Sequence, residues 1–377
     1  MRRTLPQARG YRPARIASSA LCHPADGAPR PASPGVLMRV PALIAGLAAG
    51  LALILAPPPA RAQPVAGDAP LGIGLEGFPY PYPVRFLPLS RDHEAQRLAY
   101  MDVAPVGQPN GRTVVLLHGR NFPSSYWQPV ITALTGAGYR VVAPDQLGFG
   151  KSSKPVGPFT FDAMAADTVA LLDALGLERV DVVAHSMGGM LAVRLARNAP
   201  ARVNSLVLEA PIGLEDYRFS VPPVPNAVLL KREGELTADA YRKQLVTSYA
   251  LTLPPEAIEP FVSLRERVKG SGEYPRWLQS FVNSYVAIWG QPVVHEIPLV
   301  VAPTLFVMGG LDRNAPGKPF APPELQAKMG DNAGHARALA ARMANGRAEV
   351  IEGVGHLVHM EATDRFNALA LDFLNSH

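Results

Sequence analysis

A serine between a strand-like run and a helical segment is the residue of this sequence best placed to do chemistry. Ser186 follows the apolar run 180–185 and precedes residues 187–198, whose apolar side chains have helical spacing. Small residues stand two before and two after it, at Ala184 and Gly188, as a tight turn requires. Such a turn exposes the hydroxyl at the carboxyl end of a sheet, next to the N–H groups of a helix. The pattern predicts a serine nucleophile, with alanine at the first position where glycine is usual.

A serine hydroxyl needs a neighbouring base, because its pKa is too high for unaided attack. Two histidines, His356 and His359, follow the last strand-like run. Two acids stand at the ends of earlier runs, Asp312 after residues near 308 and Glu209 after 208. Either acid would lie at the carboxyl edge of the sheet and could orient an imidazole. The sequence therefore offers the parts of a serine, histidine and acid triad.

The segments that must position these residues alternate between buried strands and amphipathic helices. Strands are predicted at 84–89, 96–103, 113–117, 139–144, 180–185, 203–208, 304–308 and 348–352, and helices at 126–137, 161–175, 187–198, 323–328, 333–345 and 362–374. Continuous apolar runs are typical of parallel strands that are buried on both faces. The fold class is therefore α/β, with a mostly parallel sheet and helices on both faces.

The alternation stops after Ala210-Pro211 and resumes near residue 299. The intervening residues, 212–298, contain aromatic side chains at helical spacing and no strand-like run, which predicts an inserted helical cap. Tyr285 and Trp289 are candidates to line an apolar pocket there, although aromatic residues at this spacing more often form core. The predicted organisation is a leader at 1–62, an extension at 63–83, a core formed by 84–211 and 299–377, and the cap.

The positive charge of the chain lies mostly in its leader. The whole chain has 36 Lys and Arg and 31 Asp and Glu, a net charge of +5. Residues 1–62 hold eight of the basic residues and one acid, which leaves 28 basic and 30 acidic residues, net −2, in 63–377. A nucleic-acid partner is therefore not expected for the folded part. The single cysteine, Cys22, also lies in the leader, so a mature chain would have no disulfide or thiol nucleophile.

Residues 38–62 have the order of a secretory signal peptide. Arg39 precedes the apolar run 40–56, and Ala60-Arg61-Ala62 is a small-residue cleavage pattern. We expect cleavage after Ala62 and export to the periplasm or the medium. The alternative is an uncleaved anchor and thus a membrane contact through the leader, but the run is shorter than the ~20 residues of a membrane span. Met1 and Met38 are both candidate translation starts, since the first 37 residues add nothing to this signal.

Several motifs in order make the chain resemble the α/β-hydrolase family, over about residues 84–377. The motifs are His118-Gly119, the loop 145–153, the serine segment 184–189, Asp312 after a strand, and Gly355-His356 after the last strand. Their order, serine then acid then histidine, is that of the family. The stretches 118–122, 211–216 and 312–318 are similar to an exported bacterial subgroup with a helical cap. The resemblance implies the α/β-hydrolase fold and a capped serine hydrolase.

The resemblance also implies roles for individual residues. It favours His356 over His359 as the base, because the catalytic histidine of the family directly follows glycine. It implies that the N–H groups of Met187 and Arg120 form the oxyanion hole, with Asn121 as the alternative donor because one extra residue stands in the loop.

The remaining choices concern the acid and the loop after the first buried strand. Asp312 is favoured over Glu209 as the orienting acid. His118 is expected to have a structural role in the loop, and the side chain of Arg120 is expected to be solvated rather than to bind a carboxylate.

The function predicted from these residues is hydrolysis through an acyl-enzyme. The default substrate is a carboxylic ester of a small to medium apolar acid, a small molecule. The same triad could instead serve C–C bond, amide or perhydrolysis chemistry, and a ligand-binding protein on the same fold is a further alternative that the intact triad disfavours. No cofactor and no metal is expected, because the H-E-x-x-H spacing is absent. The sequence does not indicate an oligomeric state.

The predicted signal peptide has a direct test. Mass spectrometry of the exported protein is expected to find Gln63 as the first residue, because the A-x-A pattern ends at Ala62. Any other N-terminus on the exported protein would contradict this cleavage site.

Overall fold

The computed structural model describes residues 69–91 and 94–377. The predicted leader at 1–62, with its apolar run and cleavage site, and the first residues of the extension lie outside the described residues. Within the described ranges, no helix combines the length and the apolarity needed to cross a bilayer.

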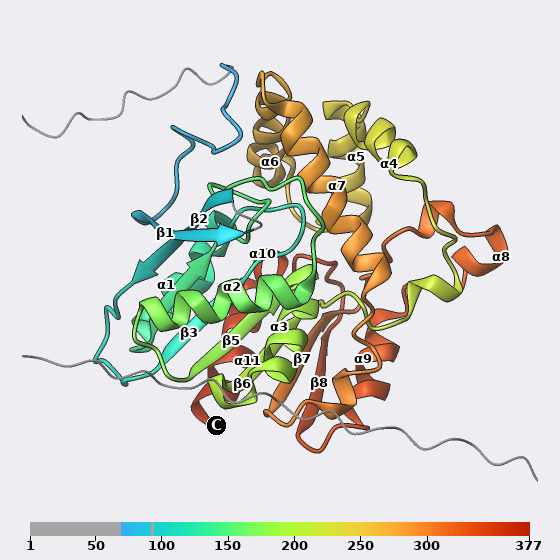
Figure 1. Cartoon of the computed structure of the whole chain (residues 1–377). Coiled ribbons are helices and arrows are strands. Elements are labelled where there is room, and N and C mark those ends of the chain that lie inside the picture. Colours follow the sequence, from blue (N-terminus) through green and yellow to red (C-terminus); the bar gives the residue numbers. More distant parts are fainter. Residues whose placement is uncertain (1–68, 92–93) are drawn as a thin grey trace, which may run out of the picture. The chain divides into compact units, whose positions relative to one another are not determined.

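A sheet of eight strands forms the centre of the described part of the chain (Figure 1). The strands are β1 (Val84–Arg91), β2 (Glu94–Val103), β3 (Thr113–Leu117), β4 (Arg140–Pro144), β5 (Val180–His185), β6 (Val203–Glu209), β7 (Thr304–Gly309) and β8 (Gly346–Ile351). Their order is β1-β2-β4-β3-β5-β6-β7-β8. β2 pairs antiparallel with β1 and β4, and every pair from β4 to β8 is parallel. The predicted mostly parallel sheet is therefore present.

The central strands are buried because helices cover both faces of the sheet. One face packs against α2 (Phe161–Ala174), α3 (Met187–Asn198) and α9 (Asn332–Ala340), and the other against α1 (Gln128–Gly136) and α11 (Thr363–Asn375). Each residue of β5 is buried, including the polar Asp181. Its carboxylate accepts hydrogen bonds from the guanidinium of Arg112, at 2.7 and 3.0 Å, and from Ser205 at 2.8 Å. The strand that leads to Ser186 is thus anchored at its start as well as along its length.

The C-terminal elements differ from the predicted boundaries. The helix predicted at 333–345 is α9, which is capped by the side chain of Asp331 and ends at Ala340. Gly346 approaches this helix end so closely that a Cβ there would lie 2.6 Å from the carbonyl oxygen of Ala340. The chain therefore turns sharply and enters β8 two residues earlier than predicted. The helix predicted at 323–328 is the four-residue α8 (Pro323–Gln326).

Residues 212–298 contain four α-helices, and the loop after the second of them is hydrogen-bonded to the C-terminal part of the chain. The helices are α4 (Asn226–Gly234), α5 (Ala238–Ser248), α6 (Pro255–Lys269) and α7 (Tyr274–Gly290), drawn in yellow to orange in Figure 1. After α5, the carbonyl oxygen of Tyr249 accepts the N–H groups of His356 and Leu357, at 2.9 and 3.2 Å. Residues 212–298 therefore hold the backbone of the loop that carries His356, the histidine predicted to be the base.

Candidate active site

Ser186 occupies a strained turn between β5 and α3. Its φ of 55° and ψ of −117° lie where residues with a side chain are rarely found. Backbone hydrogen bonds hold this conformation: the N–H of Ser186 donates to Glu209 O at 3.0 Å, and Ile212 N–H donates to Ser186 O at 3.2 Å. Such a conformation costs roughly 1–3 kcal/mol and persists only when the surroundings enforce it. Here the end of β6 and the segment after it enforce it.

The two glycines after Ser186 allow neighbouring backbone to approach the turn. A Cβ on Gly188 would lie 2.2 Å from the carbonyl oxygen of Leu117, the last residue of β3. A Cβ on Gly189 would lie 2.5 Å from the Cβ of Pro211. Both distances are too short for a side chain to fit, so glycine is required at both of these positions in the first turn of α3. The close approach brings the loop after β3 against the serine.

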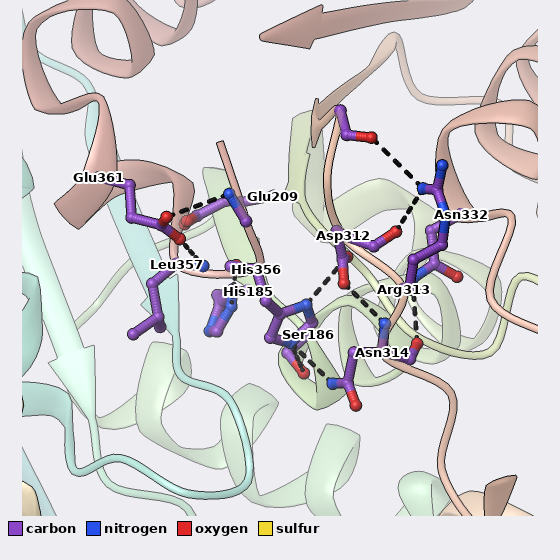
Figure 2. Close-up of polar contacts among 12 residues, drawn as sticks. His185, Ser186, Glu209, Asp312, Arg313, Asn314, Asn332, His356, Leu357 and Glu361 are labelled. Carbon is purple, nitrogen blue, oxygen red and sulfur yellow. Dashed lines mark hydrogen bonds and ion pairs between the residues drawn. The ribbon is translucent and has the colours of Figure 1, made fainter. Parts of the chain in front are cut away.

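The structure brings Ser186, His356 and Asp312 into one hydrogen-bonded chain (Figure 2). His356 Nε2 lies 2.9 Å from Ser186 Oγ, and His356 Nδ1 lies 3.0 Å from Asp312 Oδ2. The histidine and the aspartate are fully buried and Ser186 is 5% exposed. A carboxylate accepts only, so Nδ1 carries the proton and Nε2 is free to accept the serine hydroxyl. This geometry and tautomer fit a general base next to a serine.

Asn314 is a neighbour of this chain that the sequence analysis did not identify. Its backbone N–H donates to Asp312 Oδ1 at 2.9 Å, so both oxygens of that carboxylate are engaged. Its side-chain Nδ2 lies 3.2 Å from His356 Nε2, on the same nitrogen that faces Ser186 (Figure 2). The residue two positions after an acid carries no signal in the sequence pattern, which is why it was missed.

His359 and Glu209 form a separate buried pair. His359 Nδ1 lies 2.8 Å from Glu209 Oε1, which also accepts the backbone N–H of His359 at 2.8 Å. Both side chains are fully buried, and Glu209 makes no contact with His356 of the kind that Asp312 makes. Of the two histidines and two acids weighed from the sequence, His356 and Asp312 are the ones aligned with Ser186.

His185 links the serine turn to the two loops around it. Its Nε2 lies 3.0 Å from the carbonyl oxygen of His356, which makes Nε2 the donor and Nδ1 the acceptor. Tyr126 donates its hydroxyl to Nδ1 at 2.9 Å and accepts the N–H of Gly119 at 3.0 Å. Burial lowers the pKa of His185 well below its usual value, and the nearby His356 and His359 lower it further. A neutral His185 thus connects the loop after β3 with the histidine loop.

The loop that carries His356 is fixed from both sides. Glu361 accepts the N–H groups of Gly355 and Leu357, at 3.1 and 3.2 Å, while Tyr249 holds the N–H of His356 itself. Three successive backbone donors are therefore satisfied, and the imidazole is positioned without help from the substrate.

The predicted oxyanion donors lie on either side of the serine. Met187 is the first residue of α3 and directly follows Ser186. Arg120 directly follows Gly119, and Gly119 lies so close to the serine that a Cβ on it would be 3.1 Å from the Cβ of Ser186. Among the residues that the structure describes, the N–H groups of Met187, Arg120 and Asn121 have no hydrogen-bond acceptor, so each could donate to an oxyanion. The choice between Arg120 and Asn121 stays a prediction.

His118 keeps the loop after β3 in place, as expected. Its Nε2 accepts the N–H of Gln146 at 2.9 Å, and its Nδ1 therefore donates to the carbonyl oxygen of Gly119 at 2.7 Å. Burial lowers the pKa of His118, in agreement with a neutral ring.

A cavity of about 800 Å³ lies between Ser186 and the inserted helices. Tyr285 lines it, as predicted, but Trp289 is not among the lining residues and donates its indole N–H to Val221 O at 3.0 Å. The cavity wall is mixed in polarity, whereas an apolar pocket was expected. Charged residues at the wall comprise five cations and one acid: Arg120, Arg232, Lys243, Arg313, Lys318 and Glu233.

The side chain of Arg120 also differs from its expected solvated state. It is only 16% exposed and lies 3.8 Å from the centre of the Phe281 ring, with its Nε donating to Ser284 Oγ at 2.9 Å. The cap helix α7 covers it, which the local sequence around His118-Gly119 could not indicate. In the described ranges there is no group of three or more metal-ligating side chains.

Comparison with known proteins gives the family. The model of the alpha/beta hydrolase family matches residues 114–369. The chain belongs to this family. A putative non-heme chloroperoxidase of Synechocystis is 28% identical over 77% of this chain and 99% of its own length. A 2-hydroxy-6-oxo-6-phenylhexa-2,4-dienoate hydrolase of Comamonas testosteroni is 30% identical over 70% of this chain and 88% of its own.

A solved structure agrees with this assignment. A probable hydrolytic enzyme of Pseudomonas aeruginosa is 37% identical, has a TM-score of 0.78, and covers 82% of this chain and 99% of its own. The fold class predicted from the sequence, the α/β-hydrolase fold, is confirmed, and the chain is a hydrolase-family enzyme.

The contact between Gly188 and Leu117 gives a prediction for the serine turn. Gly188→Ala is expected to lower the free energy of unfolding by about 1–3 kcal/mol, because the added methyl forces the turn and β3 apart. Gly136→Ala is the control: it also adds a methyl to a helical glycine, but nothing lies within 4 Å of that position. Urea denaturation of both variants checks this, and equal stabilities would contradict the steric requirement.

Proposed function

We propose that the protein is an exported serine hydrolase, with carboxylic esters as its substrates. The observation that supports this most is the continuous hydrogen-bonded chain from Ser186 Oγ through His356 to Asp312, at 2.9 and 3.0 Å. It opens onto a cavity large enough for a small molecule. Ester cleavage is the least demanding reaction for such a triad, since the leaving alcohol needs little assistance.

In the first half of the reaction, Ser186 Oγ attacks the ester carbonyl carbon while His356 Nε2 takes its proton. Asp312 stabilises the imidazolium that forms and keeps its ring oriented. The carbonyl oxygen becomes an oxyanion, which accepts hydrogen bonds from the N–H of Met187 and from that of Arg120 or Asn121. Collapse of this intermediate breaks the bond to the alcohol oxygen, which receives the proton from Nε2.

The second half hydrolyses the acyl-enzyme. Water gives a proton to His356 Nε2 and attacks the acyl carbon, and the same N–H groups bind the new oxyanion. The bond to Ser186 Oγ then breaks, the serine recovers its proton, and a carboxylic acid leaves. The side-chain amide of Asn314, with Nδ2 at 3.2 Å from Nε2, can donate to this nitrogen only while it carries no proton, that is, before each attack.

Hydrolysis of a C–C bond next to a ketone is the second candidate. Two observations favour it: the Comamonas testosteroni relative carries the name of a dienoate hydrolase, and the cavity of this chain is basic enough for such an anion. The relative named as a chloroperoxidase makes perhydrolysis a further use of the same residues. If the protein turned over a 2-hydroxy-6-oxo-dienoate and no ester, C–C bond hydrolysis would replace ester hydrolysis as the proposed reaction.

The nucleophile is tested by Ser186→Ala. This variant is expected to lower kcat for a short 4-nitrophenyl ester by at least about 10³-fold, because only binding and the oxyanion donors then remain. A fluorophosphonate probe is expected to label the wild type at Ser186 and not the variant. Retained turnover in a folded Ser186→Ala protein would exclude the mechanism.

The acid is tested by a matched pair of variants. Asp312→Asn is expected to lower kcat by roughly 10³–10⁴-fold, because the amide favours the wrong tautomer of His356. Glu209→Gln is expected to lose far less activity and instead lower the free energy of unfolding by about 1–3 kcal/mol, since it perturbs the buried contact with His359. The reverse pattern, with kcat lost on changing Glu209, would reassign the acid.

A further inference from the structure

Two arginines, Arg265 buried and Arg120 partly buried, share one carboxylate at the wall of the cavity. Glu233, at the end of α4, contacts Arg265 of α6 at 2.5 Å and Arg120 at 3.8 Å. The exposed fractions of the two arginine side chains are only 5% and 16%. The three groups together carry two positive charges and one negative, and the shorter distance assigns the carboxylate to Arg265. Arg120 is left without a full counter-charge.

The other contacts of Arg120 engage only part of its donors and do not balance its charge. Its Nε donates to Ser284 Oγ and its Nη2 to Phe281 O, at 2.9 and 3.3 Å, and both acceptors are neutral. In the described part of the chain, Nη1 has no hydrogen-bond partner. Burial lowers the pKa of Arg120. Burial acts in the same direction on Arg265, but Glu233 together with Tyr241 and Tyr274 outweighs it and the pKa of Arg265 is raised. A largely buried charge that shares its only counter-ion is costly, so an anion bound in the cavity would stabilise this site.

The remaining cations of the cavity wall add to this positive field. Arg232, Lys243, Arg313 and Lys318 have no carboxylate within ion-pair distance among the described residues. Two of them make hydrogen bonds to neutral groups, Lys318 Nζ to Met329 O at 3.0 Å and Arg313 to the carbonyl of Asp312 at 2.9 Å. Residues 63–377 have a net charge of −2, so the excess of cations is local to the cavity. A recess with an excess of one sign of charge concentrates ligands of the opposite sign.

We propose that the substrate carries a carboxylate in addition to the group that Ser186 attacks, and that Arg120 is its ion-pair partner. The net single charge of the Arg120, Arg265 and Glu233 group matches one carboxylate better than a phosphate, which carries nearly two. A guanidinium with a free N–H also has the geometry that carboxylates prefer. This inference rests on the proposed function for the ester, and places the half-ester of a dicarboxylic acid ahead of an ester of an apolar acid.

The first test compares two esters of equal acyl length, 4-nitrophenyl hydrogen glutarate and 4-nitrophenyl pentanoate. The preference is measured as kcat/KM for the anionic ester divided by kcat/KM for the neutral ester. Arg120→Met is expected to lower this ratio by at least about tenfold, because a charge-assisted hydrogen bond is lost. The Arg265 and Glu233 pair stays balanced in this variant, so it is expected to fold. Arg120→Lys is expected to keep part of the preference.

Arg242→Gln is the matched control. Arg242 is another cap arginine, paired with Glu259 and Asp239 on the surface, and it does not line the cavity. Its removal changes the net charge by the same amount and is expected to leave the ratio unchanged. An equal fall of the ratio in Arg242→Gln and Arg120→Met would show a general charge effect and overturn the assignment of Arg120.

A binding experiment separates failure of this inference from failure of the proposed function. Calorimetry with Ser186→Ala is expected to detect glutarate binding, no binding of neutral glutaramide, and loss of glutarate binding when Arg120→Met is added. With these results and no turnover of either ester, the carboxylate site would stand and the ester mechanism would fall. Turnover of both esters with a ratio unaffected by Arg120→Met would remove the carboxylate site and leave the hydrolase.

Discussion

The steric contact between the serine turn and the end of β3 is the constraint on which the site depends. Ser186 takes a left-handed backbone conformation, and Gly188 then passes so close to Leu117 O that no side chain fits between them. This contact sets the serine, the start of α3 and the loop after β3 at fixed positions. The packing that forms the serine turn therefore also places the N–H groups that are proposed as oxyanion donors.

Buried hydrogen bonds extend this rigidity to the base. The path from Gly119 through Tyr126 and His185 to the carbonyl oxygen of His356 joins two loops that are far apart in the sequence. Each histidine on this path has its tautomer set by a neighbour whose donor or acceptor role is unambiguous. The imidazole that faces Ser186 is thereby held with its accepting nitrogen toward the hydroxyl before any substrate arrives.

What the sequence could predict follows from how local each signal is. Ser186, Asp312 and His356 each follow a strand, and parallel strands end at one edge, so their meeting could be foreseen. Tyr126 with His185 and Glu209 with His359 meet only through packing of the whole core, and no local pattern indicates such pairs. The side chain of Arg120 also shows that local sequence does not reveal contacts with distant residues. Its loop suggested a solvated side chain, whereas cap residues more than 100 positions later bury it.

Two requirements act on the inserted segment at once. Its helices supply Glu233 and Arg265, which set the charge balance around Arg120, so under the proposed function this segment would select the substrates that reach Ser186. Its loop at Tyr249 also holds the backbone of His356, so it fixes the position of the proposed base and lines the cavity as well. Under this proposal, substitutions that alter charge on α4 and α6 would change specificity and leave the base aligned as long as the Tyr249 contact is kept. Selection of the substrate and alignment of the base are separate in chemistry but share one structural element.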